Sequence, residues 1–328
     1  MGIYSKKLKN TGTFKTKKRI FMKKIILLIF LTYMTTCLVK AQQDPHYCHF
    51  MFLQPSYNPA YCGTEGMINA VAVNRTQWAG MTGSPNTTTL SVDAPVNFLG
   101  THSGVGLTIS NDVVGYEKNF LAKFAYAYHI NVGTGLLSIG VDAGLYNKTI
   151  DGDWQFPDEP ESIFGGKTRK MVFDLGAGLL YKVENLTLGF SSVHALEPEI
   201  DFSEDGKTYL ARHYYFTGAY NIPLANALLD LTPNVIAMSD GNTLQFDINI
   251  NILYNKKILG GVTYRNKDAI ALLAGLTIMN DFRVGLAYEL GVSKLRKTNI
   301  GSFEVMLGYA FMPERSKPAQ KSRSVRFL

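Results

Sequence analysis

Hydrophobic and polar residues alternate with a period of two along residues 135–148, GLLSIGVDAGLYNK. One face of an extended chain would carry the apolar side chains of Leu137, Ile139, Val141, Ala143 and Leu145, and the other mostly small or polar groups. This period indicates a β-strand and not a helix. A length of about ten residues also suits a tilted strand that crosses a bilayer, because strands of soluble domains average about five or six residues.

The same alternation recurs in about fourteen segments, and no segment of helical period interrupts them. They are residues 66–78, 86–96, 103–111, 119–131, 135–147, 171–183, 185–193, 212–222, 227–238, 243–254, 257–266, 268–279, 281–290 and 301–312. An even number of strands agrees with single-chain outer-membrane barrels. We therefore predict an all-β fold, a transmembrane antiparallel up-and-down β-barrel of about 14 strands over residues 65–312.

The connections between these segments differ in length. Those that follow residues 131, 183, 222, 254 and 279 are short, and those that follow residues 147 and 193 are long. Outer-membrane barrels have short periplasmic turns and longer extracellular loops. Counting strands from the first segment therefore predicts that both termini lie in the periplasm and that loops 149–170 and 194–211 face outward.

A secreted soluble β-protein, either a sandwich or a propeller, would alternate in the same way. The long strands, and the Gly, Asn and Asp on their polar faces, favour the membrane barrel, and 18 Tyr and 19 Phe suit its aromatic girdles. Charged residues within the predicted strands could only point into the lumen or lie at the rims. These are Arg75, Asp93, Lys123, Asp142, Asp174, Asp247, Arg265 and Glu304. They either fill the lumen as ion pairs or select what enters it.

Both ends of the chain differ from the body. Met22-Lys23-Lys24, an apolar run over 25–31 and Val39-Lys40-Ala41 predict a signal peptide over residues 1–41, cleaved after Ala41, with 1–21 as an upstream extension. Ten of the 33 Lys and Arg lie there, so 23 remain against 26 Asp and Glu. The basic pI is therefore no sign of a nucleic-acid partner. Residues 313–328 form a basic tail, either a solvated end or a periplasmic handle for an acidic partner.

Residues 42–64, QQDPHYCHFMFLQPSYNPAYCGT, are aromatic and Pro-rich without a strand or helix period. We expect this apolar segment to pack on or in the barrel. An oxidising compartment would allow a disulfide between Cys48 and Cys62, although two cysteines alone carry little pattern. His46, Cys48 and His49 lack the spacing of a tetrahedral metal site. No hydrolase, P-loop or dinucleotide motif occurs, so we predict no catalytic, cofactor or metal site and no barrel-borne hydrolase.

Several motifs resemble the PorP/SprF family of outer-membrane proteins of the type IX secretion system of Bacteroidota. They are Gln43-Asp44-Pro45, Tyr57-Asn58-Pro59-Ala60-Tyr61, Asn74-Arg75-Thr76-Gln77-Trp78, Thr263-Tyr264-Arg265, the run from Phe282 to Tyr288, and Val325-Arg326-Phe327. The chain departs from the family pattern at His46, Cys48 and His49, at Glu289 where Asp is usual, and at Phe303 where His often precedes the Glu.

The resemblance implies a non-enzymatic barrel that exports, docks or retains secreted proteins, among them a gliding adhesin. It further implies contact with outer-membrane lipid and with periplasmic lipoprotein and OmpA-like, peptidoglycan-binding partners. The residues that it marks for partner binding or as family motif are Asp44, Pro45, Tyr57, Asn58, Pro59, Asn74, Arg75, Gln77, Trp78, Asp93, Arg265 and Glu304, with Arg323, Arg326 and Phe327 as tail contacts. The alternative is an outer-membrane channel or transporter for small or hydrophobic solutes.

Overall fold

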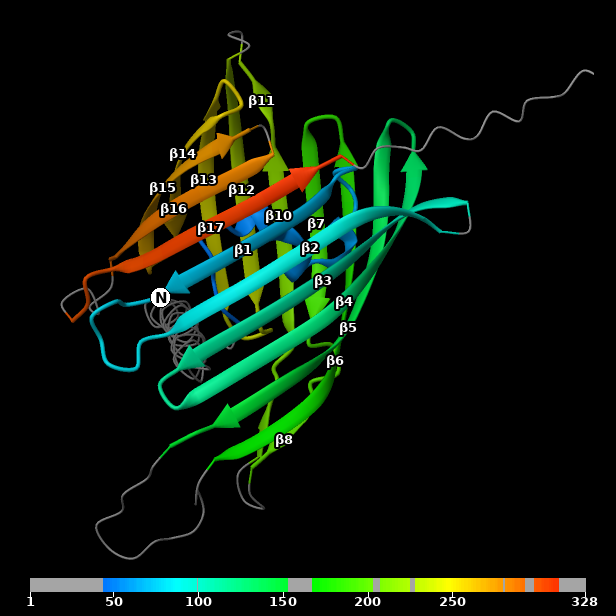
Figure 1. Ribbon diagram of the computed structural model, residues 1–328. Helices are drawn as coiled ribbons and strands as arrows, with labels where there is room; N and C mark the ends of the chain where they lie inside the picture. The colour runs from blue at the N-terminus through cyan, green and yellow to red at the C-terminus, as the bar shows by residue number, and fades with distance from the viewer. Residues whose placement is uncertain are drawn as a thin grey trace, which may run out of the picture. The chain divides into compact units, whose positions relative to one another are not determined.

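Fourteen long strands wind into one closed antiparallel barrel in the computed structural model (Figure 1). The structure describes residues 44–98, 100–152, 167–202, 207–224, 228–279, 281–292 and 298–312. The signal peptide and the basic tail predicted above lie outside these residues. No helix in the described ranges is long and apolar enough to span a membrane.

Each long strand pairs with its neighbours along the chain. The strands are β1 (Ile68–Thr76), β2 (Asn86–Phe98), β3 (Thr101–Val114), β4 (Glu117–Val132), β5 (Gly135–Ile150), β6 (Thr168–Val183), β7 (Leu186–Val193), β10 (His213–Tyr220), β12 (Leu229–Ser239), β13 (Leu244–Tyr254), β14 (Ile258–Arg265), β15 (Ala269–Ile278), β16 (Phe282–Gly291) and β17 (Ser302–Phe311). Pairing of β1 with β17 and of β10 with β12 completes the circle. The predicted fourteen-stranded up-and-down barrel is confirmed.

Three short strands lie in the described parts of the connections. β8 (Glu199–Asp201) and β9 (Lys207–Tyr209) pair as a hairpin within the loop that follows β7. β11 (Ile222–Pro223) pairs with the first part of β12. None of the three changes the closure of the barrel.

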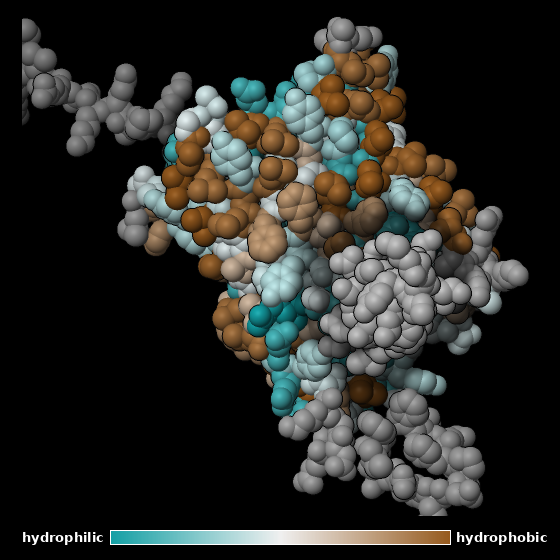
Figure 2. All heavy atoms as spheres, turned by 180° about the vertical axis from the view of Figure 1, so that it is seen from behind, coloured by the Kyte–Doolittle hydropathy of each residue, from teal (hydrophilic) through white to brown (hydrophobic). Residues whose placement is uncertain are grey.

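The alternating pattern separates the two faces of the wall. In β13 the exposed side chains are those of Ile248, Ile250 and Ile252, while Asp247, Asn249 and Asn251 are buried inside. Hydrophobic side chains gather in the same way over the outer surface (Figure 2). A single wall with an apolar outside and a polar inside is the arrangement of a membrane barrel, so the soluble sandwich or propeller is wrong.

The two ends of the barrel differ. The end that we call the short-turn end carries turns 133–134, 184–185 and 255–257, and the opposite, long-loop end carries loops 151–167 and 194–212. β1 begins and β17 ends at the short-turn end. From the usual asymmetry of outer-membrane barrels, we expect this end to face the periplasm.

The segment before β1 forms three short helical turns, η1 (Phe50–Phe52), α2 (Gln54–Tyr57) and η2 (Pro59–Tyr61). Asp44, the first described residue, binds His194 and Tyr215, which lie toward the long-loop end. Residues 44–64, which we call the N-terminal segment, therefore run the length of the lumen before β1 begins. Counting strands did not predict this path, because it says nothing of a segment that precedes the first strand, and both chain termini lie outside the described residues.

Candidate functional site

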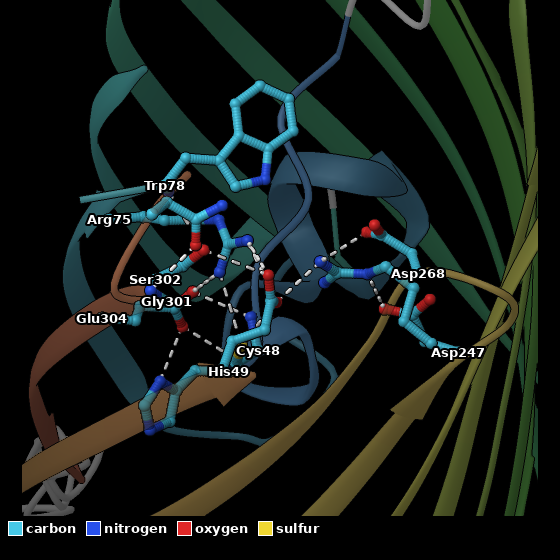
Figure 3. A network of polar contacts seen from close by, with 12 residues as sticks. Cys48, His49, Arg75, Trp78, Asp247, Asp268, Gly301, Ser302 and Glu304 are labelled. Carbon is cyan, nitrogen blue, oxygen red and sulfur yellow. Dashed lines mark hydrogen bonds and ion pairs between the residues drawn. The ribbon is translucent and has the colours of Figure 1, made fainter. Parts of the chain in front are cut away.

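Glu304, on the inner face of β17, holds the upper part of the N-terminal segment. Its carboxylate accepts hydrogen bonds from the backbone N–H groups of Cys48 and His49, both at 2.8 Å, and lies 2.6 Å from Nδ1 of His49. Glu304 is 1% exposed. Figure 3 shows these groups pointing toward one another. One carboxylate thus satisfies the free donors at the start of the η1 turn, where no earlier carbonyl can accept them.

Two arginines extend this contact into a buried charge network. Arg75 of β1 and Arg265 of β14 both donate to Glu289 of β16, at 2.8 and 2.7 Å. Arg75 also lies 3.5 Å from Glu304, and Nε of Arg265 lies 2.9 Å from Asp247 of β13. Buried charges are tolerated only when they are paired, and removing one partner is costly. The network therefore ties the N-terminal segment to five strands of the wall at once, β1, β13, β14, β16 and β17.

The loop after β1 closes over this network. Ser302 donates to Glu289 at 3.2 Å and accepts from the backbone N–H of Trp78. Ala79 and the segment 300–301 exchange two backbone hydrogen bonds. Trp78 adopts a positive φ of 50°, which non-glycine residues seldom do. The surrounding hydrogen bonds therefore hold the loop in a backbone conformation that is unfavourable by itself.

A second anchor lies at the start of the N-terminal segment. His194 stands between two carboxylates, with Nδ1 2.7 Å from Asp174 and Nε2 3.0 Å from Asp44. Asp44, 19% exposed, also accepts a hydrogen bond from the Tyr215 hydroxyl. Burial alone would lower the pKa of His194, but the charge of Asp44 and the hydrogen bonds of both carboxylates outweigh it and raise this pKa to about 10. His194 is therefore a cation at neutral pH.

The raised pKa of His194 predicts a pH dependence of stability. Below about pH 6.5 the imidazole is charged in both the folded and unfolded states, so its stabilising contribution is complete. This contribution falls as pH rises toward the folded pKa of about 10. We expect the difference in unfolding free energy between wild type and His194→Gln to be a few kcal/mol at pH 6 and to approach zero above pH 10, since one pKa unit corresponds to about 1.4 kcal/mol. Denaturant titrations of both proteins at matched pH values test this, and a pH-independent difference would contradict it.

The lower part of the N-terminal segment is held by backbone contacts. Nδ2 of Asn58 donates to the carbonyl of Leu179 at 3.0 Å, and its Oδ1 accepts from Ala60 at 2.9 Å. Further down, the backbone N–H of Gly63 donates to Asp93 of β2 at 2.8 Å. These bonds satisfy main-chain groups that would otherwise be buried without partners.

Two more wall residues bind segment carbonyls. Lys123 of β4 donates to the carbonyl of Ser56 at 2.9 Å, and Ser191 of β7 donates to the carbonyl of Tyr57 at 2.8 Å. The segment is thus bonded to the wall along most of its length.

Glycines in the wall allow the N-terminal segment to approach the strand backbone. A Cβ atom at Gly104 would collide with Cys62, one at Gly140 with Ala60, and one at Gly178 with Asn58. Gly has no Cβ, so it is the residue that permits such close backbone contact. The strands therefore carry glycine where residues 58–62 come closest, so the inner surface of the barrel is complementary in shape to these residues.

The two cysteines are free thiols, and the disulfide that the sequence allowed is not formed. Cys48 lies beside Arg75 and Glu289, whereas Cys62 packs against Ala125 and Ala127 of β4. Burial raises the pKa of both thiols. Within the described residues no group of three or more His, Cys, Asp or Glu is arranged to hold a metal ion.

The residues marked by the sequence divide into those that touch the N-terminal segment and those that do not. The marked residues that belong to the N-terminal segment are Asp44, Pro45, Tyr57, Asn58 and Pro59. Those that bind it from the wall are Arg75, Asp93 and Glu304. Arg265 joins the charge network through Glu289. Asn74 faces outward and bonds Thr88, and Gln77 and Trp78 form the loop. Arg323, Arg326 and Phe327 lie outside the described residues. Glu289, His194 and Ser191 were not predicted as site residues. The signal available for Glu289 and Ser191 was their inward position in the alternating pattern.

A family model described as type IX secretion system membrane protein PorP/SprF matches residues 39–309, most of the chain. The chain belongs to the PorP/SprF family. PorP/SprF proteins are membrane components of a secretion system and not enzymes, and the barrel described above is of the outer-membrane type. A search among functionally curated proteins finds no match.

Solved barrels share the architecture of this PorP/SprF chain at low identity. The Ralstonia pickettii toluene transporter TbuX is 10% identical with a TM-score of 0.45, over 78% of this chain and 92% of that one. A TodX mutant, a monoaromatic hydrocarbon channel, is 11% identical with a TM-score of 0.44, over 77% and 92%. Acinetobacter baumannii Omp33 is 7% identical with a TM-score of 0.43, over 75% and 98%. These likenesses concern the barrel alone.

Proposed function

We propose that this PorP/SprF protein is a plugged docking component of the type IX secretion system and not an open solute channel. The observation that carries the proposal is the N-terminal segment, which crosses the lumen and is bonded to the wall at both its ends and along its length. A channel needs a continuous water path through its lumen. In this barrel, buried side chains of the N-terminal segment such as Phe50 and Leu53 occupy the middle of the lumen.

The two ends of the barrel then have separate roles. The long loops at the outer end engage a secreted cargo protein or surface adhesin, and the short turns and basic tail 313–328 engage periplasmic lipoprotein and OmpA-like, peptidoglycan-binding partners. Signal-peptide cleavage after Ala41 releases the mature chain for insertion into the outer membrane. What supports these roles is the family, the unequal ends of the barrel and the charge of the tail.

Deletion of the gene tests the proposal. We expect one or a few type IX cargo proteins to accumulate inside the cell and to disappear from the surface, because their docking component is missing. Fractionation followed by quantitative proteomics of surface, periplasm and medium measures this. Expression of the wild-type gene from a plasmid in the deletion strain should restore export of these cargo proteins. Normal secretion and surface display of every cargo protein in the deletion strain would contradict the proposal.

The solute channel remains the competing function. It requires steady conductance or solute uptake in reconstituted liposomes by the wild-type protein. The proposal requires the opposite, a barrel that stays closed while its N-terminal segment is in place.

A further inference from the structure

A cavity of about 480 Å³ extends from the N-terminal segment to the short-turn end of the barrel. Met51, Phe52 and Pro55 of the segment form its floor, and inward residues of nine strands form its wall, together with turn residues such as Lys256. Its volume lies in the range of about 300–1,000 Å³ that is typical of ligand pockets. The N-terminal segment therefore fills the lumen toward the long-loop end, and the lumen is hollow toward the short-turn end, on the side that we expect to face the periplasm.

The cavity contains an arginine that forms no ion pair with any carboxylate of the residues that the structure describes. Arg283 of β16 lies with its guanidinium 5.4 Å from the centre of the Phe52 ring on the floor. No hydrogen bond or ion pair joins this guanidinium to the residues that the structure describes. Arg75 and Arg265, the other two arginines that point into the lumen from β1 and β14, each bind a carboxylate. Arg283 is thus a cation set on an aromatic floor and open to the cavity.

Three carboxylates, those of Glu65, Asp93 and Asp281, and a second cation, Lys256, also line the cavity. Glu65 pairs with Lys182 at 2.7 Å, and Asp93 accepts from Gly63, so neither carboxylate is bound to Arg283. Oε1 of Gln54, another cavity residue, is buried and has no hydrogen-bond partner. A ligand that suits these groups presents an anion to Arg283, an N–H to Gln54 and an apolar side chain to Met51 and Phe52.

We propose that the cavity binds an extended polypeptide segment of a periplasmic partner, in which a carboxylate stands next to an aromatic or aliphatic side chain. The inference rests on the proposed function, which puts a protein partner at the short-turn end. A peptide supplies the anion, the backbone N–H and the apolar side chain in one chain. Arginine binds carboxylates through two parallel hydrogen bonds, so Arg283 fixes the register of the bound segment.

Photocrosslinking in intact cells of the native host tests this. We place p-benzoylphenylalanine at Leu253, which lines the cavity, and at Ile252, the next residue of β13, which faces outward. We expect an ultraviolet-dependent protein adduct from position 253 and not from position 252. Mass spectrometry should find Asp, Glu or a C-terminal carboxylate within two or three residues of the crosslinked site. Absence of an adduct at 253, or attachment to a stretch without a carboxylate, overturns the inference.

Variants of Arg283 complete the test. Arg283→Ala should lower the adduct yield by about tenfold or more, and Arg283→Lys should keep part of it, because truncating one partner of a desolvated charge pair weakens binding strongly. Barrel folding of each variant is checked by its heat-dependent migration in gels. An undiminished yield in Arg283→Ala overturns the inference, and cargo export in the deletion strain separately decides the proposed function.

Discussion

Replacing Glu304 by glutamine is expected to lower the unfolding free energy of the barrel by about 3–5 kcal/mol. The substitution keeps the size of the side chain but removes the charge that Arg75, His49 and two backbone N–H groups share. Arg75 would then face Glu289 alone, and the amide nitrogen of the new side chain would replace an acceptor with a donor. Urea unfolding of the purified protein in detergent, followed by tryptophan fluorescence, measures the effect.

Glu117→Gln is the matched control for this prediction. Glu117 pairs with Lys148 at 2.9 Å in the same way, but the carboxylate is 43% exposed. Exposed ion pairs contribute at most about 1 kcal/mol, so this variant should unfold close to the wild-type midpoint. Equal losses of stability in the two variants would show that burial of the Glu304 network contributes nothing.

Replacing Gly140 by valine is expected to displace the N-terminal segment and open the barrel. The added side chain would meet the backbone of Pro59 and Ala60, which no change of rotamer can relieve. Overpacking by a few atoms costs about 1–3 kcal/mol even where side chains can move. We expect stepwise conductance in planar bilayers and rapid proteolysis of the segment in Gly140→Val, neither of which the wild-type protein should show.

Gly260→Val provides the comparison. Gly260 lies on β14 with open space where its Cβ would be, so valine should be accommodated without loss of stability or closure. If the barrel of the Gly140→Val variant also stays closed and its N-terminal segment resists proteolysis, then Pro59 and Ala60 do not pack against Gly140 as described above. If the wild-type protein conducts steadily, the solute channel replaces the plugged component as the better function.

The alternating pattern was sufficient to predict the fold, because one face of each strand contacts lipid and the other does not. It was less informative at strand ends. β5 was predicted to end at Asn147 but pairs with β6 as far as Ile150, since backbone pairing continues where the apolar alternation stops. The pattern also identified the inward charges. It could not show which of them pair, because the partners depend on the register around the barrel.

The network illustrates this limit. Arg75 and Glu289 are 214 residues apart in the sequence and meet only because β1, β17 and β16 are adjacent at a particular register. Cys48 and Cys62 are close in sequence, yet the segment between them descends through the lumen, so their thiols pack in separate clusters. The course of the N-terminal segment lacks any periodic signal, which is why its direction was not predicted.

The path of the N-terminal segment also constrains the biogenesis of the protein. The seam of the barrel joins β1, the first strand to be synthesised, to β17, the last. If β17 paired with β1 before residues 44–64 had entered the lumen, the N-terminal segment would have to be threaded into a closed barrel. Entry of residues 44–64 before β17 pairs with β1 avoids this threading step, so we expect pairing of the first and last strands to follow placement of the N-terminal segment.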